Sequence, residues 1–225
     1  GRRIDHVSFV ARAVREGVVD PDRSIQVGIR THAPDDFGIK IIHGHEVEEM
    51  PIRMNIGDGR FPKDDVYDTA ADAIAAAAQA GRQVTVLCEG DPFFYGSFMY
   101  LFARLTDRCR VEVVPGVSSL MACAVATRGA LAARNDVLTV VPAPLPEEDL
   151  RRRLQHVEAA AIIKVGRHLG KVRKVLGELK LIDRTRYVER ATLAQQRVLP
   201  LAEVKLDEAP YFSMLLVHRR GEAWR

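Results

Sequence analysis

Two glycine-containing loops carry most of the side chains in this sequence that could do chemistry. The first reads EGDPFFYG, spans Glu89 to Gly96 and follows the apolar run 84–88. The second reads PGVSS, spans Pro115 to Ser119 and follows the apolar run 111–114. Ligands of parallel sheets bind beyond the carboxyl ends of the strands, and glycine lets a backbone approach a ligand closely. We therefore expect a ligand site at these loops, although ordinary turn formation and helix capping also explain each loop taken alone.

Phosphate and metal signatures are weak by comparison. Neither loop contains GxxxxGK[ST] or GxGxxG, so neither is a phosphate loop. His43 and His45 are spaced as ligands on one strand face would be, but no set of carboxylate partners accompanies them. We therefore expect no metal. The three cysteines form no CxxC pair and no disulfide framework, which is typical of a reducing compartment, and we expect a cytoplasmic protein.

The elements that must position the loops alternate between helix and strand, which favours an α/β fold with a parallel sheet. In the first half we expect a helix over 67–80 ended by Gly81, a strand over 84–88, a helix over 97–105 and strands over 111–114 and 137–141. Three prolines in 142–146 predict a linker. Beyond it we expect helices over 147–156 and 168–180 and strands over 160–164, 186–190, 197–201 and 211–218, the last three closer together and antiparallel in spacing.

Composition limits the remaining function classes. The chain has 225 residues and a net charge of +3 from 33 basic and 30 acidic residues, a balance that gives no indication of a nucleic-acid partner. The longest apolar run, 120–126, is too short to span a membrane. Because the chain begins with Gly1 rather than methionine, we expect a trimmed or partial product. The first fifty residues differ in texture, with a helix expected over 8–15 and a strand over 24–29.

Taken together and in order, the segments of residues 48–225 resemble the tetrapyrrole methylase family. The resemblance is carried by VTVLCEGDPFFYGSFMYL, VEVVPGVSS, AAIIKVGRHLGKVRKVL, YVERATLAQQRVLPL and PYFSMLLV. Within that family, EGDPFFYGSFMYL and KVGRH are typical of the subgroup that methylates precorrin-2, whereas relatives read GGDPFIFGRG at the first site. The resemblance implies C-methylation of a meso carbon in cobalamin biosynthesis, with S-adenosyl-L-methionine as methyl donor and precorrin-2 or cobalt-factor II as substrate. It also implies a homodimer.

The same resemblance assigns residues to the methyl donor and the substrate. In this family the donor lies in the cleft between two α/β domains and is held largely by backbone groups. By matched position, its contacts here are Glu89, Gly90, Asp91, Phe94, Ser118, Ser119, Val165 and Ala191. Substrate contacts are assigned to Tyr95, Lys164, Arg167 and Arg190. The three cationic side chains match substrate carboxylates, but a solvated charge at a strand end explains each equally well. Packing under the loop is the alternative for Tyr95. No catalytic residue is assigned.

The beginning of the chain departs from the family. Tetrapyrrole methylases begin with a strand ending in a GxGPGD loop, and this sequence has none. Instead, residues 1–47 resemble a ureohydrolase of the agmatinase or guanidinobutyrase type, through DHxxF, EGxxDP, SIQVGIRT and DDFG. The manganese-binding DAHxDxY and DxDxxDP loops of that family are missing. We therefore expect a recombined chain, joined near 48–51, whose first methylase strand is missing or replaced.

The sequence predicts three domains and leaves three hypotheses about function. The expected domains are a ureohydrolase-like segment over 1–50, a partial N-terminal methylase domain over 51–142 and a C-terminal methylase domain over 143–225. The first hypothesis is an active methyltransferase. The second is a catalytically impaired module that binds a tetrapyrrole or S-adenosylmethionine without turnover, because the GxGPGD loop is missing. The third, a manganese ureohydrolase, is disfavoured by the missing ligands.

Overall fold

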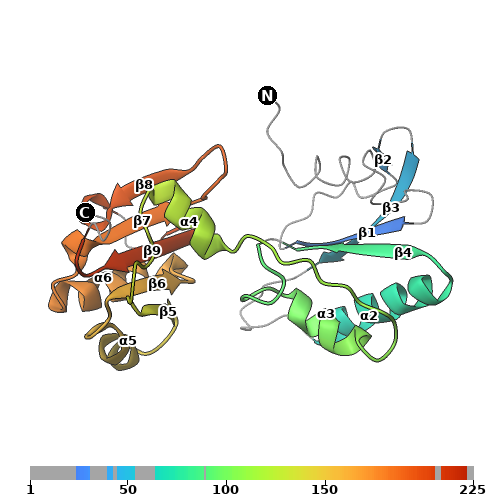
Figure 1. Cartoon of the computed structure of the whole chain (residues 1–225), viewed down its shortest axis with the longest axis horizontal. Helices are drawn as coiled ribbons and strands as arrows, with labels where there is room; N and C mark the ends of the chain where they lie inside the picture. Colours follow the sequence, from blue (N-terminus) through green and yellow to red (C-terminus); the bar gives the residue numbers. More distant parts are fainter. Residues whose placement is uncertain are drawn as a thin grey trace. The chain divides into compact units, whose positions relative to one another are not determined.

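The computed structural model of the chain describes residues 24–30, 40–42, 45–53, 64–88, 90–205 and 209–221 (Figure 1). The chain divides into two compact units, residues 1–116 and residues 117–225. Each unit contains a sheet with helices packed on it, so the α/β class predicted from the sequence is confirmed. The predicted helix over 8–15 and the predicted site residue Glu89 lie outside the described residues.

The sheet of the first unit has the strand order β2-β3-β1-β4. Its strands are β1 (Ser24–Arg30), β2 (Lys40–Ile42), β3 (His45–Arg53) and β4 (Gln83–Leu87). The predicted strand over 24–29 is therefore present as β1, and it pairs in parallel with β3 on one side and β4 on the other. The predicted joining point, 48–51, falls inside the continuous strand β3. The amino-terminal segment thus contributes a central strand to the sheet.

Two helices complete the first unit. Helix α2 (Asp64–Gln79) ends in a Schellman motif, in which Arg82 N–H donates to Ala77 C=O (3.1 Å) and Gly81 N–H donates to Ala78 C=O (3.0 Å). Gly81 takes the left-handed conformation of such a cap, as predicted, with φ +79°. Helix α3 (Phe98–Leu105) packs against α2. The core between these helices and the sheet includes the buried side chains of Ile52, Tyr67, Ala71, Ile74, Leu101 and Leu105.

The strand predicted over 111–114 is wrong. The segment runs without regular secondary structure and pairs with no strand in the described part of the chain. Val111 and Val113 nevertheless pack against the core of the first unit, while Val114 is exposed. The apolar side chains that predicted a strand are therefore explained by packing on the core. Strand β4 pairs with β1 on one side, and this segment does not pair with β4 on the other.

The second unit is built on a five-stranded sheet of order β5-β6-β9-β7-β8. The strands are β5 (Leu138–Pro142), β6 (Ala159–Ile163), β7 (Thr185–Glu189), β8 (Arg197–Pro200) and β9 (Ser213–His218). Strands β5 and β6 are parallel, whereas β9 is antiparallel to both β6 and β7, and β8 is antiparallel to β7. The predicted antiparallel character of the last three strands is confirmed. Because β6 and β7 run in the same direction, their carboxyl ends share one edge of the sheet.

Helices cover both faces of this sheet (Figure 1). Helices α5 (Glu147–Leu154) and α6 (Leu169–Glu178) bury their leucines and valines in a core with Val141, Ile162, Tyr187 and Leu215. Helix α4 (Ser119–Thr127) packs instead against β7 and β9. Short 3₁₀ turns lie at Gly166–His168 (η2), Ile182–Arg184 (η3) and Leu201–Glu203 (η4).

The two compact units divide at 116–117, and β5 pairs with β6 in the sheet of the second unit. The domain boundary expected at 142–143 stays a prediction. The proline-rich stretch 142–146 is likewise integrated into that unit: Pro142 ends β5, Ala143 is fully buried and Pro146 precedes α5. Among the described residues, no helix combines the length and the apolar character needed to cross a membrane.

Candidate functional site

The two glycine-containing loops of the sequence meet within the first unit. Asp91 accepts a hydrogen bond from Phe93 N–H through Oδ1 and from Gly116 N–H through Oδ2, both at 3.0 Å. Gly116 lies so close to the first loop that a Cβ there would stand 2.1 Å from the carbonyl oxygen of Gly90. Only glycine fits this approach. The Asp91 carboxylate therefore ties the start of the second loop to the start of the first.

These hydrogen bonds also fix the charge of Asp91. The pKa of its carboxyl lies below the ordinary value of 3.8, chiefly because Gly116 N–H and then Phe93 N–H stabilise the ionised form. Both oxygens are occupied by backbone groups, so Asp91 is arranged as a structural anion rather than a proton acceptor for a reacting group. Its neighbour Gly90 adopts φ +80°, a conformation that glycine reaches without strain.

The aromatic part of the first loop turns sharply. Tyr95 holds a left-handed backbone with φ +54°, and its half-exposed ring meets the Phe94 ring edge-on at 5.0 Å. Gly96 closes the turn, because a Cβ there would lie 2.9 Å from the carbonyl oxygens of Asp91 and Pro92. Left-handed non-glycine residues are uncommon and occur often at functional sites. The loop therefore exposes Tyr95 and leaves Phe94 partly covered.

Ser118 and Ser119 stand at the start of helix α4 in the second unit. Ser118 is the N-cap residue by position, yet its hydroxyl caps no N–H; only its carbonyl is used, by Ala122 N–H at 3.1 Å. Within the described ranges, neither serine hydroxyl has a hydrogen-bond partner. The capping alternative raised by the sequence therefore does not account for these hydroxyls, which remain available to a ligand.

The remaining predicted residues gather at one edge of the second sheet, where β6 and β7 end. Lys164 follows β6 with φ +57°, and Arg190 follows β7 with φ +49°. Strand β9 begins at this edge, and the Arg190 N–H donates to the Phe212 carbonyl just before it (2.8 Å). Arg167 is exposed in the turn η2, whose Gly166 carbonyl accepts a hydrogen bond from Ala209 N–H (3.0 Å). The structure thus brings three predicted cationic residues to one edge.

Val165 and Ala191 lie on the same two loops but differ in what they can offer a ligand. The Val165 side chain is fully buried in the core of the second unit, and its carbonyl accepts a hydrogen bond from His168 N–H (2.7 Å). Ala191 is partly buried, and in the described part of the chain neither its N–H nor its C=O has a hydrogen-bond partner. Ala191 therefore suits a ligand held by backbone groups better than Val165 does.

Sequence reasoning missed two features of this edge. Glu189 is only 2% exposed although it carries a carboxylate, and the Tyr187 hydroxyl donates a hydrogen bond to its Oε2. Tyr211 and Phe212, which the sequence assigns to a strand, precede β9, are 68% and 50% exposed, and stack edge-on at 5.1 Å. The alternation Tyr187, Glu189 in the strand pattern was the available signal for the first, since residues two apart share one face.

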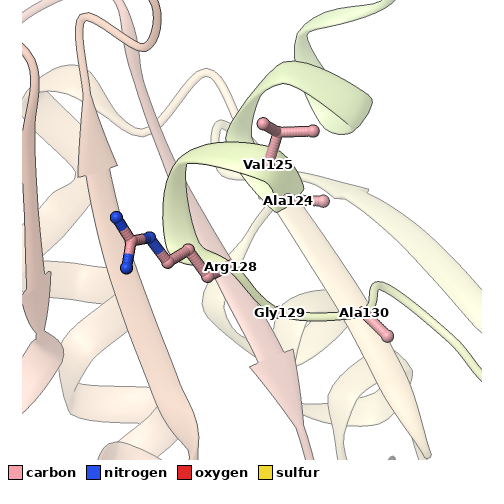
Figure 2. A pocket seen from close by; sticks show the side chains of 5 residues that line it. All are labelled: Ala124, Val125, Arg128, Gly129 and Ala130. Carbon is pink, nitrogen blue, oxygen red and sulfur yellow. The ribbon is translucent and has the colours of Figure 1, made fainter.

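A hollow on the second unit lies elsewhere. It has a volume of about 410 Å³ at the carboxyl end of α4 and is lined by Ala124, Val125, Arg128, Gly129 and Ala130 (Figure 2). None of the predicted site residues lines it. Across the residues that the structure describes, no three histidine, cysteine, aspartate or glutamate side chains come together as a metal ion would require.

Comparison with known proteins identifies the family. The model of the Tetrapyrrole (Corrin/Porphyrin) Methylases matches residues 15–206. This chain belongs to the tetrapyrrole methylase family. The match begins inside the segment 1–47, so it includes β1, which the structure places at the centre of the first sheet.

Two curated relatives of this tetrapyrrole methylase indicate the subgroup. Precorrin-2 C(20)-methyltransferase of Sinorhizobium sp is 47% identical over 153 residues, which are 68% of this chain and 62% of that protein. Cobalt-precorrin-2 C(20)-methyltransferase of Salmonella typhimurium is 28% identical over 84% of this chain and 81% of that protein. The chain thus spans less than two thirds of the length of the first relative.

Solved structures confirm the methylase fold. The methyltransferase CobJ matches with a TM-score of 0.61 at 20% identity, over 97% of this chain and 90% of that one. Uroporphyrin-III C-methyltransferase from Thermus thermophilus, solved in complex with S-adenosyl homocysteine, matches with a TM-score of 0.58 at 21% identity, over 93% and 89%.

The predicted resemblance to ureohydrolases is also confirmed. The agmatinase of Chromobacterium violaceum is 34% identical over 62 residues, which are 24% of this chain and 19% of that protein. This tetrapyrrole methylase is therefore similar, over 24% of its length, to an enzyme of a second class.

Proposed function

We propose that this chain is an S-adenosylmethionine-dependent C-methyltransferase that acts on a meso carbon of precorrin-2. The observation that carries the proposal is the 47% identity to a precorrin-2 C(20)-methyltransferase over two thirds of the chain. The subgroup segments EGDPFFYGSFMYL and KVGRH lead to the same substrate, and the second relative, a cobalt-precorrin-2 enzyme, leaves cobalt-factor II as the alternative form.

The residues present fit the methyl donor, S-adenosylmethionine. A donor held largely by backbone groups needs N–H and C=O groups without internal partners. Ala191 of the second unit supplies such groups. In the first unit, Gly116 packs directly against the Gly90 carbonyl, which holds the two glycine-containing loops together. The hydroxyls of Ser118 and Ser119 add two polar groups that no internal hydrogen bond uses. Glu89, Phe94 and Val165 complete the proposed set by family position.

The cationic residues suit the substrate. A tetrapyrrole such as precorrin-2 carries several carboxylates around a flat macrocycle. Lys164, Arg167 and Arg190 at one sheet edge offer an ammonium point charge and two guanidinium forks for such groups. We assign Tyr95 to the same role from the first unit, because its ring is half exposed and its backbone is fixed by the turn.

Methyl transfer from S-adenosylmethionine needs no acid, base or nucleophile from the protein's side chains. Bound S-adenosylmethionine supplies a methyl group already activated by the positive sulfur. The protein therefore has to align that methyl group with the electron-rich carbon and exclude water. Asp91, whose carboxylate is held by Gly116 and Phe93, is not assigned as a base. The proton that leaves the methylated carbon passes to solvent or to the substrate's own carboxylates.

Strand β1 is the element that makes an active enzyme reasonable without the family's GxGPGD strand. We propose that it stands in for that first strand, because it occupies a central position in the sheet and pairs in parallel on both sides. The domain boundaries inherited from the family, the donor's place between the domains and the homodimer stay predictions.

A catalytically impaired module is the second candidate, and the missing GxGPGD sequence favours it. The two candidates share methyl-donor binding and differ in turnover. Titration with S-adenosylmethionine under a thermal unfolding readout tests the shared step. Donor at about a hundred times its Kd stabilises a binding protein by about 2.7 kcal/mol. A shift at saturating donor supports both candidates. No shift contradicts the active enzyme and the donor-binding form of the impaired module, and leaves only a module that binds a tetrapyrrole.

A further inference from the structure

We propose that a polar cluster of Tyr187, Glu189, Gln196 and Arg197 positions the backbone of Ala191 for the methyl donor. The proposal rests on the proposed function, and none of the four residues belongs to the predicted contact set. Tyr187, Glu189 and Arg197 flank the loop 190–196, which joins β7 to β8, and Gln196 is the last residue of that loop. We call these residues the β7–β8 polar cluster.

The loop needs such support because its backbone is strained. Arg190 and Thr192, the residues on either side of Ala191, both lie in the left-handed region, with φ +49° and +69°. Neither is glycine, and threonine is β-branched, so both conformations are costly. Strain of this kind persists only where the surroundings impose it, and it is typical of functional sites.

Gln196 imposes the conformation from the far end of the loop. Its side-chain Oε1 accepts a hydrogen bond from Thr192 N–H at 2.7 Å, and two short turns, Leu193 N–H to Arg190 C=O (3.0 Å) and Gln196 N–H to Leu193 C=O (3.1 Å), set the spacing. Ala191 therefore lies between Arg190 and Thr192, whose backbones are both fixed by hydrogen bonds. Its own N–H and C=O have no partner in the described chain and are therefore free to bind the methyl donor.

Glu189 supports the loop at its base. Its carboxylate accepts the Tyr187 hydroxyl through Oε2, and Arg197 Nη1 lies 3.3 Å from Oε1. Tyr187 is fully buried, and burial followed by its bond to Glu189 raises the pKa of the phenol, so it remains a hydrogen-bond donor. Arg197 and Glu189 are also paired across the β7–β8 ladder, which fixes the loop's two ends. Buried carboxylates need such partners.

Gln196 allows a test that separates positioning from folding, because its side chain is exposed and its loss leaves no buried group unpaired. We expect Gln196→Ala to raise the Kd for S-adenosylmethionine about threefold to tenfold, the range of one net hydrogen bond, with the unfolding temperature unchanged. Gln195→Ala is the matched control, since the side chain of this exposed neighbour makes no hydrogen bond within the described chain. Gln196→Glu keeps an acceptor oxygen and should bind within about twofold of the parent.

Three results would overturn the proposal: parental affinity in Gln196→Ala, an equal loss in Gln195→Ala, or no rescue by Gln196→Glu. Amide hydrogen exchange of Thr192 keeps the test decisive if the parent chain binds no methyl donor at all, an outcome that refutes the proposed function instead. The cluster predicts a protected Thr192 amide in the parent and in Gln195→Ala, and faster exchange in Gln196→Ala. Equal exchange in all three would overturn the cluster's role independently of binding.

Discussion

At the scale of single residues, one carboxylate explains how two loops far apart in the sequence stay together. Both carboxylate oxygens of Asp91 accept hydrogen bonds from backbone N–H groups, one of which belongs to Gly116 of the other loop. The side chain of Asp91 thus holds the loops together, whereas the GDP motif implies that Asp91 contacts the methyl donor. Both can be true, because the backbone of Asp91 could still make that contact. Substituting Asp91 should therefore change the stability of the protein as well as its binding.

Replacing Asp91 by asparagine should lower stability in a pH-dependent way. A folded-state pKa below the ordinary 3.8 means that the carboxylate stabilises the fold above that pH, and that the contribution is lost as pH falls through the folded pKa. The asparagine side chain cannot titrate, and it would direct its amide NH₂ group at an N–H donor. The unfolding temperatures of parent and Asp91→Asn should therefore differ at pH 7 and converge below pH 3.8.

The matched control is Asp107→Asn, an exposed aspartate of the same unit. It should show no such convergence. Equal stability of the parent and Asp91→Asn at pH 7 would contradict the structural role of Asp91.

The serine pair predicts the reverse pattern, a change in binding without a change in stability. Because neither hydroxyl has an internal partner in the described chain, Ser118→Ala and Ser119→Ala should leave the free energy of unfolding within about 0.5 kcal/mol. If these hydroxyls contact the methyl donor, each variant should raise the Kd for S-adenosylmethionine about twofold to tenfold in calorimetric titration.

Thr127→Val is the control in the same helix, because the Thr127 hydroxyl already donates a hydrogen bond to Ala124 C=O at 2.9 Å. It should bind like the parent. A double serine variant with parental affinity would remove both residues from the proposed site.

At the scale of elements, helix ends determine where the loops begin. Gly81 ends α2 in a Schellman motif with φ +79°, and Gly177 lies in α6 without a left-handed φ. A Cβ at either position meets nothing within 4 Å, so only the backbone conformation distinguishes the two glycines. They form a natural pair for measuring what that conformation costs.

Gly81→Ala should destabilise the protein by about 1 kcal/mol, because alanine is strained in the left-handed region. Gly177→Ala should stabilise it by about 0.5–1 kcal/mol through helix propensity. Urea unfolding of both variants measures these effects. A shift of the same sign in both would contradict the assigned conformations.

Most elements could be predicted because local signals and packing agree. The helix before Gly81, the buried strand β6 and the antiparallel strands β8 and β9 all appear close to their predicted positions. The segment 111–114 could not be predicted, because its apolar alternation is satisfied by packing on the core without a ladder. The prolines of 142–146 predicted a linker, but they bound regular elements instead. Pro142 ends a strand and Pro146 precedes a helix.

The candidate site was predicted in part. The motifs located the loops that follow β4, β6 and β7, because a strand end and its loop are adjacent in sequence. They could not reveal that Asp91 bonds to Gly116, or that Gln196 bonds to Thr192, because those contacts depend on how the loops turn. The absence of a side-chain cap at Ser118 is likewise a matter of rotamer and not of sequence.

At the scale of the whole molecule, the segment shared with ureohydrolases is part of the methylase fold. Strand β1 lies between β3 and β4 and pairs with both. Val27→Pro should therefore unfold the first unit, since proline in a central strand removes a ladder hydrogen bond and is found essentially only at edges and bulges. Val27→Thr keeps the N–H and nearly the same shape, and should cost much less. Parental unfolding of the proline variant would show that β1 is not an integral strand.

The central claim, methyl transfer to precorrin-2, is tested most directly by incubating the purified chain with labelled S-adenosylmethionine and precorrin-2. Mass spectrometry then follows the tetrapyrrole, alongside a version of the chain with the GxGPGD strand restored as positive control. We predict one labelled methyl group on a meso carbon and an equal amount of S-adenosylhomocysteine. Methylation by the restored version alone, with the present chain binding the donor but forming no product, would contradict the claim and identify an impaired module.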